Sequence, residues 1–228
     1  MNAAPGLRVY YGGTFDPVHD GHLAIARAAR DALQAEIRLL PAADPPHRPA
    51  PGASAAQRVE MLQRALSGER GLLLDTFELQ REERSWSVDT LHALRAQFGA
   101  RQPIAWLVGA DSFLGLPGWK HWRELFVLTH FVVAERPGYQ LDEALPPALA
   151  RILDGRWSDT AEALRTTPAG RVLRLQQALQ PQSATELRRR IGAGQPWRQW
   201  LPPAVAEYIQ AHGLYGAAPS SGRDPLRV

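Results

Sequence analysis

Residues 7–33 read LRVYYGGTFDPVHDGHLAIARAARDAL and combine three kinds of sequence in a row. Leu7–Tyr11 is a short apolar run of β-forming residues that ends in two glycines. Leu23–Leu33 has apolar residues at helical spacing, which predicts an amphipathic helix. The residues between them include Gly, Pro and Asp, which interrupt regular structure. The sequence therefore predicts a strand, a turn and a helix at the start of the chain.

The same alternation continues to the end of the chain. Short apolar runs at 36–41, 72–79, 103–108, 131–134 and 171–175 are predicted strands. Predicted helices follow Ser54, run from Ser87 to Phe98, and lie at about 183–192 and about 202–212. Ser54 and Gln57 have the spacing of a capping box, and we expect Ser87 to cap its helix.

This order of elements predicts an α/β fold with a doubly wound, mainly parallel sheet in a single domain. Ligands of such sheets bind at the loops beyond the carboxyl ends of the strands, where the opening turn lies. We assign residues 1–215 to the domain. Residues 216–228, GAAPSSGRDPLRV, have the composition of a disordered tail.

The composition excludes several classes of protein. The chain has no cysteine, so disulfides, thiolate metal ligands and cysteine nucleophiles are ruled out. The net charge is only +3, which argues against a nucleic-acid partner. The start of the chain does not resemble a signal peptide, and no apolar run is long enough to span a membrane. We expect a cytoplasmic protein without a membrane partner, and its oligomeric state stays open.

The opening turn has the features of a phosphate site. Gly12 and Gly13 let the main chain approach a ligand closely, and Thr14 adds a hydroxyl donor. His19 and His22 stand where the next helix begins and its dipole favours an anion. The turn matches neither the Walker loop nor the GxGxxG fingerprint, so the phosphates are held in another way.

The whole segment GGTFDPVHDGH resembles the signature of the nucleotidyltransferase superfamily that carries an HxGH motif. This resemblance implies a Rossmann-like fold and transfer of a nucleotidyl group from a nucleoside triphosphate. A second segment, SATELR at 183–188, resembles the triphosphate-binding motif of the same superfamily. It implies phosphate contacts from Ser183, Thr185 and Arg188, but not from Arg189 or Arg190. Ser183 and Glu186 also have capping-box spacing, which is compatible with that role.

The middle of the chain resembles one family of this superfamily, the bacterial nicotinate-nucleotide adenylyltransferases. The segments that carry the resemblance are PPHRP at 45–49, SWSVDT at 85–90, GADS at 109–112, GWK at 118–120 and ERPG at 135–138. They occur in the family's order between about residue 8 and Tyr215. The resemblance implies that ATP and nicotinate mononucleotide react to give deamido-NAD and pyrophosphate, with Mg²⁺ on the polyphosphate.

The family also implies roles for single residues. His19 and His22 are the catalytic pair, which donates to the ATP phosphates. Asp111 is expected to contact ribose hydroxyls of the acceptor, and Trp119 to stack on its pyridine ring. Main-chain N–H groups near Ser87 and Lys120 are expected to bind the nicotinate carboxylate. His47 and Arg48 are expected to approach a phosphate from a Pro-rich loop, with the identity of that phosphate left open.

Four other functions compete with this interpretation. A transferase of the same superfamily that acts on pantetheine phosphate or glycerol phosphate is the nearest, and SWSVDT and GADS argue against it. An aminoacyl-tRNA synthetase needs a lysine-rich motif, whereas Lys120 is the sole lysine. The remaining two are a hydrolase with a metal bound by the histidines and Asp16, and a protein that binds the nucleotide as a sensor without turnover. We expect replacement of His19 or His22 by alanine to abolish turnover with little loss of stability.

Overall fold

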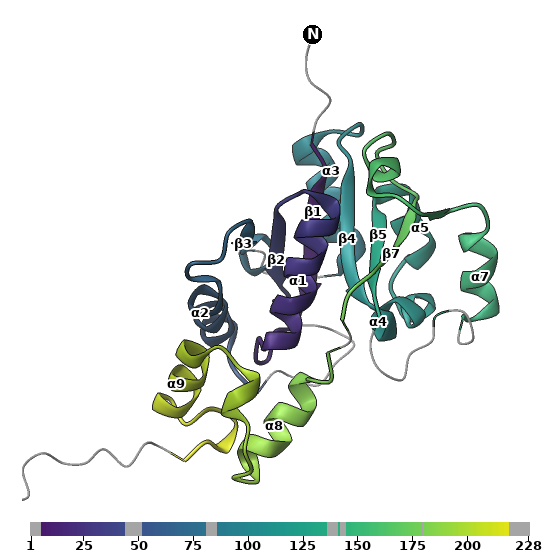
Figure 1. The fold of residues 1–228 in the computed structure, drawn as a ribbon. Helices are drawn as coiled ribbons and strands as arrows, with labels where there is room; N and C mark the ends of the chain where they lie inside the picture. The colour runs from purple at the N-terminus through teal and green to yellow at the C-terminus, as the bar shows by residue number, and fades with distance from the viewer. Residues whose placement is uncertain are drawn as a thin grey trace, which may run out of the picture.

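A seven-stranded sheet forms the centre of the protein in a computed structural model (Figure 1). The structure describes residues 6–43, 52–80, 86–135, 141, 145–178 and 180–218. The strands are β1 (Arg8–Gly13), β2 (Ile37–Pro41), β3 (Leu72–Leu74), β4 (Ile104–Gly109), β5 (His130–Ala134), β6 (Trp157–Ser158) and β7 (Val172–Leu175). Their order is β3-β2-β1-β4-β5-β7-β6, and every pair is parallel. The predicted doubly wound α/β sheet in a single domain is confirmed.

Helices cover both faces of this sheet (Figure 1). One core cluster joins the sheet to α1 (Asp20–Leu33), α2 (Ala55–Leu66), α8 (Ala184–Gly192) and α9 (Pro203–Ala211). A second joins it to α3 (Ser87–Phe98), α4 (Ala110–Leu114), α5 (Trp122–Leu128) and α7 (Pro147–Leu153). Neighbouring residues of β1 alternate between the two clusters, because side chains of a strand point to opposite faces. No helix of the described residues has the length and apolarity needed to cross a membrane.

Two details of the predicted elements are wrong. The expected strand at 72–79 ends after Leu74, because Asp75 turns the chain by accepting the Phe77 N–H on its carboxylate. A short 3₁₀ helix, η1 (Phe77–Gln80), follows. Ser87 is the first residue of α3 rather than its cap; Trp86 is the capping position and its side chain makes no capping hydrogen bond. By contrast, Ser54 and Gln57 form both bonds of the predicted capping box.

The order of strands reverses between β1 and β4. From β1 the chain passes outward to β2 and β3. From β4 it passes in the opposite direction to β5, then to β6 at the edge of the sheet, and returns to β7 between them. Open α/β sheets bind ligands in the crevice at such a reversal, beyond the carboxyl ends of the two strands. The register pairs Tyr11 with Leu107, so Gly13 and Gly109 end neighbouring strands. The opening turn and the GADS segment therefore start from the same crevice.

Candidate functional site

The opening turn leaves β1 at Gly13 and enters α1 at Asp20. A Cβ on Gly12 would lie 2.7 Å from the indole of Trp106 on β4, so this position accepts only glycine while the indole stays in place. Phe15 has a left-handed φ of 50° and its buried ring packs edge-on against the ring of His22, with centroids 5.0 Å apart. The peptide bond between Asp16 and Pro17 is cis. Packing on all sides thus fixes the path of the turn.

His19 and His22 hold each other at the start of α1. The His22 main-chain N–H donates to His19 Nδ1, and the His19 N–H donates to His22 Nδ1, both at 3.3 Å. The two rings stack with their centroids 3.7 Å apart. Because both Nδ1 atoms accept hydrogen bonds, each neutral ring carries its proton on Nε2. The pair therefore offers two Nε2–H donors beside the start of a helix, an arrangement suited to phosphate oxygens.

This geometry argues against the expectation that replacing His19 would cost little stability. The side chain of His19 is fully buried and caps α1. A Cβ on Gly21 would lie 3.0 Å from the His19 ring, which explains the glycine in the HxGH motif. Loss of His19 would remove both a helix cap and buried packing.

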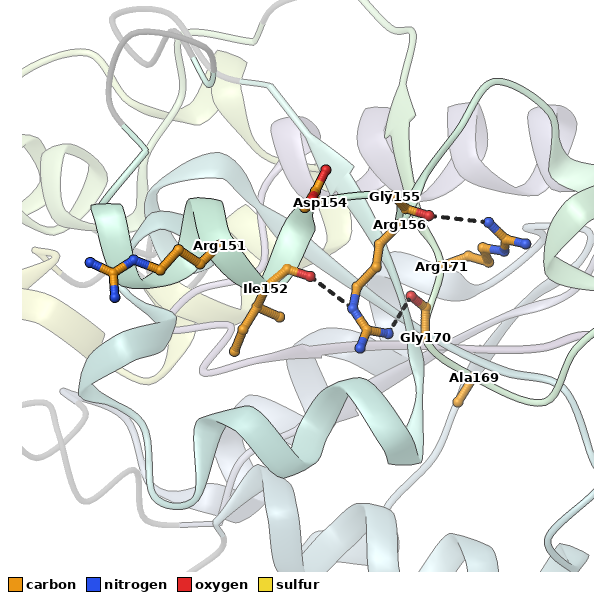
Figure 2. A pocket seen from close by; sticks show the side chains of 8 residues that line it. All are labelled: Arg151, Ile152, Asp154, Gly155, Arg156, Ala169, Gly170 and Arg171. Atoms are coloured by element: carbon orange, nitrogen blue, oxygen red, sulfur yellow. Dashed lines mark hydrogen bonds between the residues drawn. The ribbon is translucent and has the colours of Figure 1, made fainter.

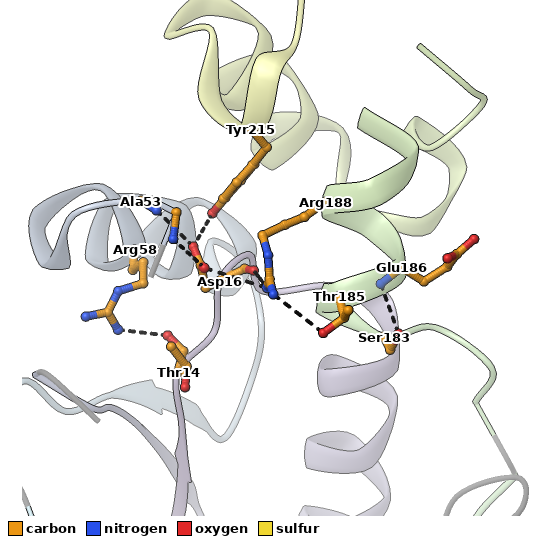
Figure 3. Close-up of polar contacts among 10 residues, drawn as sticks. Thr14, Asp16, Ala53, Arg58, Ser183, Thr185, Glu186, Arg188 and Tyr215 are labelled. Carbon is orange, nitrogen blue, oxygen red and sulfur yellow. Dashed lines mark hydrogen bonds and ion pairs between the residues drawn. The ribbon is translucent and has the colours of Figure 1, made fainter. Parts of the chain in front are cut away.

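Asp16 lies at the centre of a buried polar network (Figure 3). Its carboxylate accepts hydrogen bonds from the main-chain N–H groups of Gly52 and Ala53 at 2.8 and 3.1 Å, and from the Tyr215 hydroxyl at 2.7 Å. The guanidinium of Arg188 donates to the main-chain oxygen of Asp16 at 2.7 Å. Asp16 thus has a structural role, which argues against the hydrolase with a metal on Asp16. Within the described residues, no three His, Cys, Asp or Glu form a group that could hold a metal.

The second motif begins α8 beside the opening turn (Figure 3). The Ser183 hydroxyl accepts the Glu186 N–H at 3.2 Å, which is one half of the expected capping box. Glu186 does not complete the box. Its carboxylate instead accepts from Arg189 and Arg190, at 2.6 and 2.8 Å, and these hydrogen bonds lower its pKa to about 2. Arg188 points the other way, to Asp16 and to the Thr185 hydroxyl at 3.5 Å.

Arg58, on α2, was missed by the sequence analysis. It is almost completely buried and donates to the main-chain oxygens of Thr14 at 2.8 Å and Ala43 at 3.0 Å (Figure 3 shows the first). Nothing local distinguishes it from the exposed arginines of the chain, because its partners lie 44 and 15 residues away. The buried guanidinium of Arg58 therefore fixes the conformation of the opening turn.

The expected acceptor residues follow β4 and begin α3. Asp111 lies in the first turn of α4, directly after the carboxyl end of β4. Trp119 follows a single 3₁₀ turn, η2 (Leu116–Gly118), which contacts both α4 and α5. It is half-buried and packs against the second core cluster. Asp111 therefore lies at the crevice on the β4 side, whereas Trp119 lies after η2, against the second core cluster.

Lys120 is engaged with the first turn of α3. Its ammonium pairs with the carboxylate of Asp89 at 3.0 Å and lies 5.6 Å from the centre of the Trp86 ring. Ser87 lies between Trp86 and Asp89 in the sequence, so the side chain of Lys120 reaches the segment that contains Ser87. His47 and Arg48 lie outside the described residues. The described chain stops at Ala43 and resumes at Gly52, beside the buried network around Asp16.

A separate depression of about 590 Å³ lies at the amino ends of β6 and β7, the sheet edge opposite the crevice. Figure 2 shows its arginines. Arg156 donates to the main-chain oxygens of Ile152 and Gly170, at 2.8 and 3.1 Å, and Arg171 donates to that of Gly155 at 3.4 Å. These side chains tie loops together, and the depression does not belong to the candidate site.

Comparisons with known proteins agree on one family. The sequence model described as cytidylyltransferase-like matches residues 10–190. A probable nicotinate-nucleotide adenylyltransferase from Stenotrophomonas maltophilia is 59% identical over 92% of this chain and 96% of its own length. One from Marinobacter nauticus is 43% identical over 95% and 100%. A solved Plasmodium falciparum nicotinic acid mononucleotide adenylyltransferase, complexed with NaAD, has a TM-score of 0.70 at 16% identity, covering 92% of this chain and 97% of that one. This last likeness supports the Rossmann-like fold.

Proposed function

Since the chain belongs to the nicotinate-nucleotide adenylyltransferases, a family of nucleotidyltransferases, we propose that it joins nicotinate mononucleotide to the AMP moiety of ATP. The products are deamido-NAD and pyrophosphate, in a step of NAD biosynthesis. The observation that carries this proposal is the pair of motifs at one place. The imidazoles of His19 and His22 and the guanidinium of Arg188 all border the opening turn, which lies at the crevice where the strand order reverses.

The reaction is an in-line displacement. An oxygen of the 5′-phosphate of nicotinate mononucleotide attacks the α-phosphorus of ATP, and the bond from that phosphorus to the bridging oxygen of the β-phosphate breaks. Pyrophosphate leaves with the electron pair of that bond. Such a reaction requires positioning and charge neutralisation rather than a nucleophile from the protein. This explains how a chain without cysteine can perform it.

The histidines donate from Nε2 to the phosphate oxygens that gain charge as the new bond forms. Their Nδ1 atoms are held by main-chain N–H groups, so the rings are positioned before the substrate binds. Donors fixed in this way typically contribute a factor of about 10²–10³ in turnover each. Gly12, Gly13 and Thr14 form the adjoining wall of the triphosphate site. The start of α8, with Ser183, Thr185 and Arg188, binds the triphosphate from the other side.

The acceptor lies on the β4 side of the crevice. Asp111 accepts hydrogen bonds from ribose hydroxyls, and the indole of Trp119 stacks on the electron-poor pyridine ring. The nicotinate carboxylate binds at main-chain N–H groups near Ser87 and Lys120, where the helix dipole of α3 favours an anion. His47 and Arg48 approach a phosphate from the 44–51 segment.

Mg²⁺ enters with ATP as part of the substrate. Its role is to neutralise the charge that collects on the departing pyrophosphate. We further propose a cytoplasmic location.

The experiment that tests this proposal measures pyrophosphate release and dinucleotide formation with ATP and Mg²⁺. Nicotinate mononucleotide, nicotinamide mononucleotide and phosphopantetheine are compared as acceptors. We expect the highest kcat/KM with nicotinate mononucleotide. Turnover with phosphopantetheine alone would keep the adenylyl transfer and discard the acceptor. Absence of turnover with all three would favour a nucleotide sensor, and zinc in the purified protein would favour the hydrolase.

A further inference from the structure

The hydroxyl of Tyr215 donates a 2.7 Å hydrogen bond to Oδ1 of Asp16, across 199 positions of the sequence. Tyr215 lies in η5 (Leu214–Gly216), which contacts α8, and its own φ is 59°, in the left-handed region. Its ring fills the space beside Gly52, where a Cβ would lie 3.0 Å from it. The segment around Tyr215 thus contacts the opening turn at Asp16 (Figure 3).

Each carboxylate oxygen of Asp16 already has a neutral donor. Oδ2 accepts the Gly52 N–H at 2.8 Å, and Oδ1 accepts the Ala53 N–H at 3.1 Å besides the Tyr215 hydroxyl. Nη1 of Arg188 lies 3.6 Å from Oδ2, beyond hydrogen-bond distance, and donates to the Asp16 main-chain oxygen at 2.7 Å instead. The aspartate therefore stands beside the arginine without a direct hydrogen bond between carboxylate and guanidinium.

We propose that Tyr215 is a positioning residue for ATP binding: its hydroxyl holds the Asp16 carboxylate so that the Arg188 guanidinium stays available to the triphosphate. The proposal rests on the proposed function of Arg188. Without the hydroxyl, Oδ1 keeps one donor, and the carboxylate is left with an open acceptor position that the nearest cation can fill. That cation is Arg188, whose side chain is partly exposed while that of Asp16 is almost fully buried. A closer ion pair would then compete with the phosphates.

The protonation state of Tyr215 suits this role. Burial, followed by its hydrogen bond to Asp16, raises the pKa of the hydroxyl well above its usual value. The hydroxyl therefore stays a donor over the whole pH range in which the protein is handled. Tyr208, on α9, provides a matched control: it is a partly buried tyrosine near the same end of the chain, and its ring contacts His212 and Arg64 instead of the Asp16 network.

The test measures equilibrium binding of ATP with Mg²⁺ in the absence of an acceptor, by calorimetry. For Tyr215→Phe we expect a Kd for ATP about 5- to 20-fold higher than for the wild type, near the lower end of the cost of one hydrogen bond to a charged group. In turnover assays, the KM for ATP should rise while the KM for the acceptor stays unchanged. Tyr208→Phe should bind ATP like the wild type.

A double-mutant cycle with Arg188→Ala separates positioning from general stability. If Tyr215 acts through Arg188, Tyr215→Phe has no further effect on ATP affinity in the Arg188→Ala protein. Equal effects in both backgrounds would overturn the proposal. So would a lower Tm of Tyr215→Phe with unchanged ATP affinity, because that would show a structural role only. Absence of ATP binding by the wild type would instead contradict the proposed function, so the two failures are distinguishable.

Discussion

The ring of His19 stacks on the ring of His22 at a centroid distance of 3.7 Å, and each Nδ1 accepts the main-chain N–H of the other residue. One pair of side chains thus caps α1 through Nδ1 and carries the ring proton on Nε2 in a fixed tautomer. The same two rings serve the capping and the proposed catalysis, through different nitrogen atoms. Substitutions must be chosen so that the two functions separate.

Replacement of His19 by asparagine or by alanine separates them. Asparagine is a favourable N-cap residue and can accept the His22 N–H, whereas alanine cannot. We expect turnover to fall at least about 10²-fold in both variants, because both lack the Nε2 donor. The free energy of unfolding should be about 1 kcal/mol lower for His19→Ala than for His19→Asn. Steady-state assays and urea titrations measure the two effects. Near-normal turnover of His19→Asn would remove His19 from the mechanism.

Local sequence patterns predicted most of the fold because the signals lie within a few residues of each other. The capping box of Ser54 and Gln57 and the apolar run of β4 are examples, and both appear as expected. The prediction of a strand at 72–79 failed at Asp75. That residue has the side chain for a local turn, which a count of apolar residues overlooks. The same local reasoning started α3 one residue too late, because it assigned Ser87 as the N-cap. In the structure Ser87 is the first helical residue.

Arg58 provides a prediction about stability. Arg58→Met keeps the length of the buried side chain but leaves the main-chain oxygens of Thr14 and Ala43 without these donors. We expect the free energy of unfolding to fall by about 2–4 kcal/mol, the range for hydrogen bonds from a charged group plus buried acceptors left unsatisfied. Arg64→Met on the same helix is the control. Arg64 pairs with Glu60 at the surface, and its loss should cost less than about 1 kcal/mol.

Urea unfolding curves monitored by circular dichroism measure both variants of α2. Equal stabilities for Arg58→Met and Arg64→Met would mean that the buried contacts of Arg58 contribute no more than a surface pair. If Arg58 fixes the opening turn as described, Arg58→Met should also raise the KM for ATP, while Arg64→Met should leave that KM unchanged.

Lys120 provides a prediction about acceptor selectivity. Because its ammonium is paired with Asp89, we expect Lys120→Met to lower kcat/KM for nicotinate mononucleotide no more than about fivefold, which corresponds to ~1 kcal/mol. The ratio of kcat/KM between nicotinate and nicotinamide mononucleotide should change little, since we propose that main-chain N–H groups near Ser87 and Lys120 supply the selectivity. A loss of this ratio by about 10²-fold would assign the carboxylate contact to the ammonium instead.

Distance along the chain limits what the sequence could predict of the site. Two motifs, at 12–22 and 183–188, were recognisable because each is contiguous. The contact between the two motifs was not recognisable, because Arg188 and Tyr215 reach Asp16 across 172 and 199 positions. From the sequence, Asp16 was consequently considered only as a metal ligand of the competing hydrolase. Only the fold shows that Asp16 joins the start of α2, α8 and η5.

His130 predicts how stability depends on pH. The side chain is fully buried at the start of β5; Nδ1 accepts the Arg171 N–H at 3.0 Å, and Nε2 donates to the Thr167 main-chain oxygen at 2.8 Å. Burial lowers the pKa of His130 from 6.5 to about 4, and the hydrogen bond to Thr167 opposes part of this shift. The folded protein therefore holds this imidazole neutral at pH values where the unfolded chain binds a proton.

The free energy of unfolding should accordingly rise with pH between about 4 and 6.5. The contribution of His130 is fully present above pH 6.5 and is lost as the pH falls to about 4, by up to ~3 kcal/mol. Urea titrations from pH 4.5 to 7.5 measure it, on the wild type and on His130→Gln, whose stability should depend less steeply on pH. His92→Gln is the control, since His92 is half-exposed and pairs with Glu124 at the surface. Identical slopes for His130→Gln and the wild type would show that the imidazole titrates alike in both states, and that its two buried hydrogen bonds do not depend on its charge.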